Sequence, residues 1–436
     1  MRSPELTDSK VENRIQVSVG DLRIGMYVGA LDRPWLESPF LLQGFPLRSM
    51  SDIEQLQSLC RHVFVDRDKS ASGSLMGMKE QRAAPVTSTE IKQTKGGLRR
   101  TVSRLFGGLT SRRSRELAHQ VEQGLGRSEQ IFNETRSLAR QIIDDVRIGS
   151  AIDTKTAREA VSDCVDHVLN NSDALMMLSN IKSKDNYTSE HSVNVSILSI
   201  ILGQSAGLQR AHLEEIGLAG LLHDVGKVLT PDEILNKPER LTDEEFLIMR
   251  MHPSQGRDIL DTAEGLSHPI VDVAHQHHER LNGTGYPRRL RVNDLGLETR
   301  IVAIADTYDA ITSDRVYGKG RPNLEAYQIL RAASGSHYDE TLVAKFLDTI
   351  GVYPPGTAVQ LRNGQFGIVV RRNPTQSLRP LVLLVKDAKL RPIKPRYIDT
   401  AESKPVFHIS RAVRALDHDI DVQMFQDRGF RDALTG

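Results

Sequence analysis

The sequence predicts a mainly α-helical protein, an all-α helical bundle with a small N-terminal α+β domain and a small C-terminal β module. Three observations support this fold class. Alternating apolar and polar residues precede residue 70, apolar residues recur every three or four positions between about 115 and 350, and β-type runs return after residue 355. Because a chain of 436 residues is longer than one hydrophobic core ordinarily accommodates, we expect two or three domains.

Residues 1–70 are predicted to form the α+β domain. Short β-type runs occur in "IQVSV" and "HVFVD", and a helical turn lies between them in "SDIEQLQSL". Residues 71–112 are rich in Ser, Gly, Lys and Gln, which is typical of a linker too polar to collapse. Eight Lys or Arg residues and no acidic residue lie between Ile91 and Arg115. We interpret this basic stretch as solvated linker, with a contact to a nucleotide, a membrane or a partner as the alternative.

Connecting helices are expected over residues 113–155, and the helical bundle over residues 156–350. Within "TAREAVSDCVDHVLNN" the apolar residues recur at helical spacing and predict one buried stripe, formed by Ala157, Val161, Cys164, Val165 and Val168. His167 lies beside this stripe, and we interpret it as polar surface rather than as a ligand. In residues 351–436, β runs on both sides of Asn363-Gly364 predict a hairpin, and "PLVLLV" predicts a third strand. These last residues are therefore predicted to form a small β module and a tail.

The composition excludes several function classes. The chain has 57 Lys and Arg against 56 Asp and Glu, so no overall field attracts a nucleic acid polymer or a membrane surface. Cys60 and Cys164 are far apart and lack CxxC spacing, which argues against a disulfide framework and a thiolate zinc site. The N-terminus lacks the apolar core of a signal peptide, and no run of about 18 apolar residues could span a membrane. We expect a soluble protein of the reducing cytoplasm.

The histidines are concentrated in the predicted bundle, where ten of the fourteen lie between positions 167 and 337. Imidazole and carboxylate groups are ordinary ligands of divalent metals, and helices can direct several of them to one point in a core. The candidate ligands are His191, His223, Asp224, His252, His277, His278 and Asp306. The density of these residues predicts a metal site.

The adjacent pair His223 and Asp224 carries the strongest signal, because it lies among aliphatic residues in "LLHDVGK". Two such groups left unpaired in a core would cost several kcal/mol, on the order of a buried polar group without a partner. The two oxygens of Asp224 could bridge a pair of metals while His223 binds one of them. Asp306, in the apolar run "RIVAIADTYDA", raises the same problem.

The histidines outside this pair are weaker signals when each is taken alone. His191 by itself is typical of an exposed histidine at the start of a helix, and His252 before Pro253 leaves both interpretations open. In "HQHHE" we favour His277 and His278 as ligands, with His275 outside the site.

Several catalytic classes lack their motifs: the sequence has no HExxH, no GxxxxGK[ST], no GxSxG and no GxGxxG after a strand.

The segment "HHERLNGTGYP", with "LLHDVGK" before it and "RIVAIADTYDAITSDRVY" after it, closely resembles the HD-GYP domains of bacterial phosphodiesterases that degrade cyclic di-GMP. The resemblance covers about residues 156–350 and implies an all-α HD-type helical bundle. The first 70 residues resemble the small domain that often precedes HD-GYP domains, through "DLRIGMYV" and "PWLESPF". A regulatory or oligomerisation role is expected for that domain, and homo-oligomers are an open possibility.

The resemblance implies that the seven candidate residues bind iron, manganese or another divalent metal, with Asp224 as the bridging ligand. Some members of the family carry a third metal on a glutamate where this chain has Tyr187, so two metals are expected. Lys227 corresponds to a lysine on the scissile phosphate, and Arg315 to an arginine near the other phosphate. A basic residue often found in the family is replaced here by Gly318.

The signature loop contains Gly283, Gly285, Tyr286 and Pro287. The family uses this loop around the substrate and for contacts with diguanylate cyclase (GGDEF) domains. A purely structural turn explains the glycines equally well, because glycine permits positive φ and close backbone approach.

The function expected from these features is metal-dependent hydrolysis of cyclic di-GMP to pGpG or GMP. Two metals would share a hydroxide that attacks phosphorus, with Asp224 and Lys227 as the catalytic residues. The alternatives are a phosphodiesterase for mixed cyclic GMP-AMP and a non-catalytic cyclic-dinucleotide sensor or scaffold. The complete ligand set and Lys227 argue against the sensor.

Overall fold

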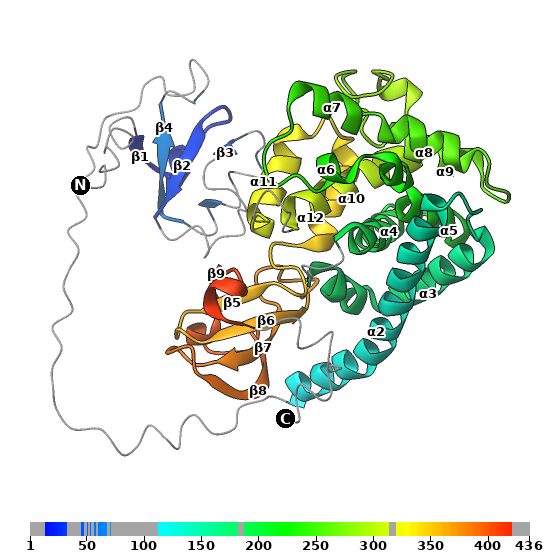
Figure 1. Cartoon of the computed structure of the whole chain (residues 1–436). Coiled ribbons are helices and arrows are strands. Elements are labelled where there is room, and N and C mark those ends of the chain that lie inside the picture. Colours follow the sequence, from blue (N-terminus) through cyan, green and yellow to red (C-terminus); the bar gives the residue numbers. More distant parts are fainter. Residues whose placement is uncertain are drawn as a thin grey trace, which may run out of the picture. The chain divides into compact units, whose positions relative to one another are not determined.

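The computed structural model of the chain divides into two compact units, residues 1–107 and 108–436 (Figure 1). It describes residues 14–32, 45–47, 50, 53, 56–57, 60–67, 70, 112–181, 187–313 and 320–420. The segment "PWLESPF", most of the basic stretch, and residues Arg315, Gly318 and Lys319 lie outside these ranges. The predicted fold class is confirmed, since strands and a short helical segment precede a helical bundle that a β-sheet follows.

The first unit contains a four-stranded antiparallel sheet in the order β1-β4-β2-β3. Its strands are β1 (Arg14–Ser18), β2 (Tyr27–Leu31), β3 (Phe45–Pro46) and β4 (His62–Asp66). Residues on β4 alternate between buried and half-buried, as the sequence pattern predicts for a strand with one face on a core. The core of this unit includes Met26, Val28, Leu56, Val63 and Val65.

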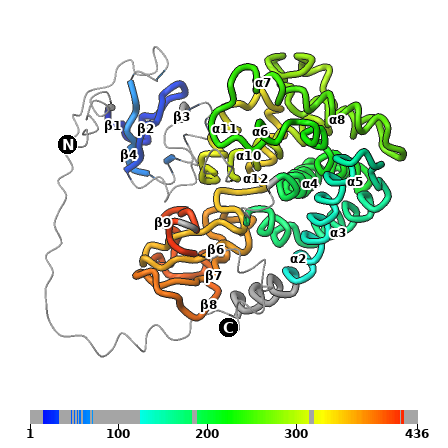
Figure 2. The backbone as a smooth tube through the Cα atoms, viewed as in Figure 1, coloured from blue at the N-terminus to red at the C-terminus, as the bar shows by residue number. Residues whose placement is uncertain are grey.

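The second unit begins with the long helix α2 (Arg112–Arg147), which packs along α3 (Thr154–Asn180) and also contacts α4 (Tyr187–Ser205) (Figure 2). The next elements are α5 (Arg210–Leu222), the 3-10 helix η4 (Val225–Leu229), α6 (Asp232–Leu235), α7 (Asp243–Met249), α8 (His252–Leu260) and α9 (His268–Gln276). The bundle ends with α10 (Leu297–Thr312), α11 (Asn323–Ala333) and α12 (Glu340–Ile350). Within the described ranges, no helix combines the length and the apolar character needed to cross a membrane.

Helix α3 begins at a side-chain cap, where Asp153 accepts a hydrogen bond from the backbone N–H of Thr156 at 3.0 Å. The stripe predicted on this helix is buried throughout, from Ala157 to Val168. His167 is half-buried, and its Nε2 lies 2.5 Å from Oγ of Ser128 on α2. Helix α4 is buried on nearly every side, which makes it the central helix of the bundle.

The last part of the chain forms a five-stranded antiparallel sheet in the order β8-β7-β6-β5-β9. The strands are β5 (Ala358–Leu361), β6 (Phe366–Arg371), β7 (Leu381–Lys386), β8 (Pro392–Asp399) and β9 (Ile409–Ala412). The predicted hairpin joins β5 to β6 through Asn363 and Gly364, whose φ is +84°. The sheet packs on α3, because Met177 and Ile181 share a core with Phe366 and Ile368.

Strands β8 and β9 were not predicted from the sequence. Pro392 and Pro395 interrupt the β pattern of β8, since proline cannot donate a ladder hydrogen bond. Strand β8 is at the edge of the sheet, where a missing donor is tolerated.

The 3-10 helix η4 approaches the start of α8 closely. A Cβ atom on Gly226 of η4 would lie 2.0 Å from the backbone oxygen of His252 and 2.4 Å from the backbone nitrogen of Gly256. Only glycine fits there without a backbone shift. The contact places Asp224 and Lys227, on either side of Gly226, beside the start of α8.

We therefore expect Gly226→Ala to destabilise the protein by about 1–3 kcal/mol, because the added methyl group must push η4 away from α8. Gly256→Ala is the matched control, since its Cβ would meet no atom closer than 3.4 Å. Urea denaturation of both variants measures the effect. Equal stability of the Gly226→Ala variant and the wild type would show that the two elements are not held this closely.

Candidate metal centre

Five elements of the bundle direct the predicted ligands toward one point. The residues come from α4, from the end of α5 and the turn after it, from the start of α8, from the end of α9 and from α10, and they are His191, His223, Asp224, His252, His277, His278 and Asp306. All are buried except His278, which is half-buried. His191 is only 2% exposed, so its interpretation as an exposed helix-start histidine is wrong.

One group of possible ligands consists of His191, His223 and Asp306. Nε2 of His191 lies 3.2 Å from Oδ1 of Asp306, and Nε2 of His223 lies 4.0 Å from the same oxygen. A second group consists of His252, His277 and His278. The Nε2 atoms of His252 and His277 are 3.2 Å apart.

Asp224 lies between the two groups and turns one oxygen to each. Its Oδ2 is 3.2 Å from Nε2 of His223 and 3.5 Å from Nε2 of His191. Its Oδ1 is 3.3 Å from Nε2 of His252 and 3.5 Å from Nε2 of His277. The carboxylate can therefore contact a cation in either group.

Backbone carbonyls fix the orientation of three of the imidazole rings. Nδ1 of His223 donates to the carbonyl of Gly220 at 2.7 Å, and Nδ1 of His252 donates to that of Met249 at 2.7 Å. Nδ1 of His277 similarly donates to the carbonyl of Ala274 at 3.0 Å. Because Nδ1 carries the proton, Nε2 presents its lone pair to the centre of the cluster.

Asp309 holds His191 and was not identified from the sequence. Oδ2 of Asp309 accepts a hydrogen bond from Nδ1 of His191 at 2.7 Å, and its oxygens also accept from Asn194 and Ser313, each at 3.1 Å. The carboxylate is fully buried. The signal was available, because Asp309 follows Asp306 by one helical turn in the same apolar run.

The second group is electrically neutral. Burial lowers the pKa of His252 to about 3, and it also lowers the pKa of His277 and His278. Neutral imidazole is the form that binds metals.

The carboxylates, by contrast, are ionised and attract positive charge. Burial opposes ionisation of Asp224, but the neighbouring His223 and Lys227 side chains hold its pKa well below the ordinary value. Burial likewise opposes a charged His191, yet hydrogen bonds to Asp224, Asp306 and Asp309 raise its pKa to about 10. A divalent cation would satisfy the same requirement for positive charge.

Two buried atoms at the centre of the cluster fit a metal site. Nε2 of His223 and Oδ1 of Asp224 have no hydrogen-bond partner among the described residues. Burying such atoms without a partner costs about 1–3 kcal/mol each. Nitrogen and oxygen ligands in these numbers suit a first-row divalent ion, and the donor set therefore fits the predicted metals.

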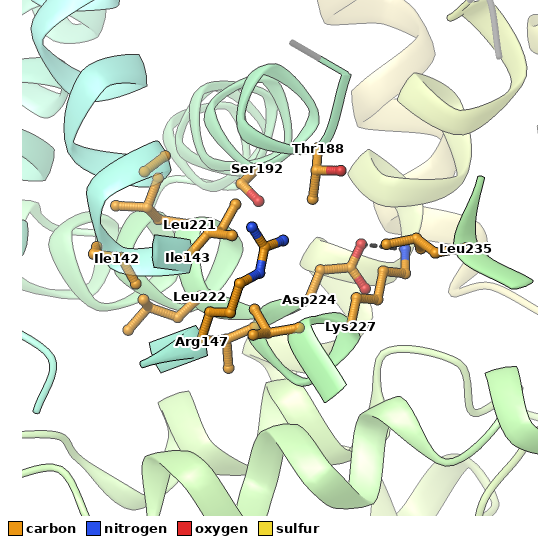
Figure 3. Close-up of a pocket in the computed structure, with 13 residues that line it drawn as sticks. Ile142, Ile143, Arg147, Thr188, Ser192, Leu221, Leu222, Asp224, Lys227 and Leu235 are labelled. Atoms are coloured by element: carbon orange, nitrogen blue, oxygen red, sulfur yellow. Dashed lines mark hydrogen bonds and ion pairs between the residues drawn. The ribbon is translucent and has the colours of Figure 1, made fainter. Parts of the chain in front are cut away.

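Lys227 lies at the rim of this centre, where its ammonium forms an ion pair with Oδ2 of Asp224 and its side chain is 21% exposed. A pocket opens beside these two residues (Figure 3). Arg147, from the last turn of α2, lines the pocket and was not identified from the sequence.

The signature loop packs against the second group of ligands. The ring of Tyr286 lies 4.7 Å from that of His278, and the guanidinium of Arg250 lies 4.6 Å from the Tyr286 ring. A Cβ on Gly285 would meet the Cα of Glu279 at 2.4 Å, and Gly283 has a φ of +78°. The backbone therefore requires glycine at both positions, as the interpretation of the loop as a structural turn predicts. Pro287 follows Tyr286 in the same loop, whereas Arg315 lies outside the described residues.

Comparison with known proteins shows similarity along both units. Residues 175–342 match the family described as HD domain, and residues 14–157 match a domain of unknown function (DUF3391). A cyclic di-GMP phosphodiesterase from Pseudomonas aeruginosa is 34% identical over 387 residues, which cover 88% of each protein.

Two further relatives are similar over different shares of the chain. The 3'3'-cGAMP-specific phosphodiesterase 1 of Vibrio cholerae is 38% identical over 158 residues, which span 36% of each protein. The solved structure of an HDG"Y"P protein from Bdellovibrio bacteriovorus is 18% identical, with a TM-score of 0.45, over 77% of this chain and 99% of that one.

Because Asp309 orients His191, we expect Asp309→Asn to weaken metal binding by about 10- to 100-fold. The amide keeps the shape of the side chain but removes the charge that holds the Nδ1 proton. Calorimetric titration with Mn²⁺ measures the affinity. Asp399→Asn is the control, since Asp399 is also buried but lies in the β module. Wild-type affinity in the Asp309→Asn protein would contradict this role.

Proposed function

The chain belongs to the HD-GYP family of cyclic-dinucleotide phosphodiesterases, and we propose that it hydrolyses cyclic di-GMP with two divalent metal ions in the buried cluster. The two-sided position of Asp224 is the observation that carries this proposal, because each of its oxygens faces a separate group of ligands. We assign one ion to His191, His223 and Asp306 and the other to His252, His277 and His278, with Asp224 shared. Iron and manganese are the proposed metals.

Such ions, when bound, supply an activated water as nucleophile and stabilise negative charge on the phosphate. The protein itself supplies a further positive charge, the ammonium group of Lys227. In the structure its ammonium neutralises Asp224. With metal ions held by Asp224, the Lys227 ammonium would be available to bind the scissile phosphate and to offset the charge that develops on its oxygens.

The proposed reaction is the addition of water to phosphorus and the cleavage of the P–O3′ bond. This step opens the ring to linear pGpG, and a second hydrolysis of the same kind gives GMP. Mixed cyclic GMP-AMP is the alternative substrate, and the similarity to the Vibrio cholerae enzyme supports it. A non-catalytic sensor is less well supported, because all seven candidate ligands and Lys227 are present.

The surroundings of the catalytic domain have proposed roles of their own. We assign residues 156–350 to catalysis and residues 1–70 to regulation or oligomerisation, with residues 71–112 as the linker. Residues 283–287 form a candidate contact for a diguanylate cyclase domain, and the exposure of Thr284 on this loop supports that role.

Asp224→Ala should abolish metal loading and hydrolysis together, because it removes the one ligand that both groups share. Metal per chain is measured after purification with iron or manganese, and anion-exchange chromatography follows cyclic di-GMP. We expect about two metals per wild-type chain and conversion to pGpG or GMP. Asp272→Ala, at an exposed position on α9, is the control and should behave as the wild type. Retained turnover in the Asp224→Ala protein would refute the assignment.

Lys227→Ala should keep the metals but lower kcat by about 10²- to 10³-fold, because the lost ammonium acts on the phosphate rather than on the metals. Lys345→Ala is the control, since Lys345 lies on α12 and donates to the carbonyl of Ser205. Metal content and steady-state kinetics separate the two effects. Loss of metal from the Lys227→Ala protein would make Lys227 a structural partner of Asp224 instead.

A further inference from the structure

The pocket beside Asp224 is formed where α2 crosses the catalytic centre. Helices α2, α4, α5 and α6 and the 3-10 helix η4 contribute its walls (Figure 3). Most of the lining is aliphatic and includes Ile142, Ile143, Leu221 and Leu235. Because Asp224 belongs both to this lining and to the metal centre, a substrate bound at the metals has this pocket beside it.

Arg147 brings a guanidinium group into this apolar space. Figure 3 shows its side chain extending from α2 toward Ser192, with the guanidinium near the centre of the pocket. Arg147 forms an ion pair with Asp144 at 3.7 Å, and both side chains are more than half exposed. A pair of this kind contributes little stability, so Arg147 can turn its donors to a ligand at little cost.

An ion pair holds α2, the helix from which Arg147 extends, against α4. Arg136 on α2 forms an ion pair at 3.0 Å with Glu190, the residue before the ligand His191. Glu190 is buried. A buried partner makes this pair costly to break.

Lys227 lies at the metal side of the pocket, and the aliphatic part on α2 and α5 suits a purine base better than a phosphate. Aliphatic walls pack well on the faces of a base but do not solvate an anion. Guanine presents two acceptors, O6 and N7, which match the paired donors of a guanidinium. Adenine presents a donor, N6, in place of O6. We propose that the pocket receives one base of the cyclic dinucleotide and that Arg147 recognises guanine there.

This inference rests on the proposed function, and the kinetics of Arg147→Ala test it. Cyclic di-GMP serves as substrate, and cyclic di-AMP serves as a competitive inhibitor that lacks O6. We expect the KM for cyclic di-GMP to rise about tenfold with kcat unchanged, since one charged hydrogen-bonding contact is lost. The inhibition constant of cyclic di-AMP should change less than twofold. Arg147→Lys should not restore the KM, because an ammonium cannot donate in the same paired way.

Two controls distinguish recognition of the base from damage to the site. Arg140→Ala removes an exposed arginine from the same helix, outside the pocket lining, and should leave every constant unchanged. Hydrolysis of bis(p-nitrophenyl) phosphate, which has no base, should be equal in the Arg147→Ala and wild-type proteins.

The outcomes separate this inference from the proposed function. If wild-type protein turns over cyclic di-GMP and Arg147→Ala has the same KM, the base-recognition role is wrong and the proposed function stands. An equal loss with bis(p-nitrophenyl) phosphate would also overturn it, because Arg147 would then act on the metal centre. Wild-type protein that neither binds nor hydrolyses cyclic di-GMP would overturn both.

Discussion

The buried carboxylate of Asp224 is the constraint on which the catalytic half of the structure depends. An ionised carboxylate in a core costs several kcal/mol unless positive charge or donors surround it. Here each oxygen faces two imidazoles, and Lys227 provides the one neighbouring ammonium recorded for the described residues. The surrounding helices are arranged so that this one side chain stays paired.

Helix ends, rather than helix faces, supply most of the proposed ligands. His223 follows the last turn of α5, His252 begins α8, and His277 follows α9. At the ends of α5 and α9, backbone carbonyls lack helical partners, and ring Nδ1 atoms use them as acceptors. The same hydrogen bonds that complete these helices therefore orient the rings. Gly226 then permits the close contact that brings η4 and α8 together.

Much of this arrangement could be predicted from the sequence, because a polar residue within an apolar run is recognisable as a buried polar group that needs a partner. Asp224 and Asp306 were found in this way, and Asp309 satisfies the same criterion one turn later. Arg147 could not be found, since only the packing of α2 on α4 and η4 brings it to the pocket. The exposed interpretation of His191 failed because a short motif does not reveal that α4 is the central helix. Strand β8 was missed because its prolines are tolerated only at a sheet edge.

Anomalous diffraction from crystals of the manganese-loaded protein tests the central claim most directly. Asp224 as a bridging ligand predicts two peaks, one contacted by His191, His223 and Asp306 and the other by His252, His277 and His278, each within bonding distance of an Asp224 oxygen. A single peak, or two peaks of which only one contacts Asp224, would contradict the account.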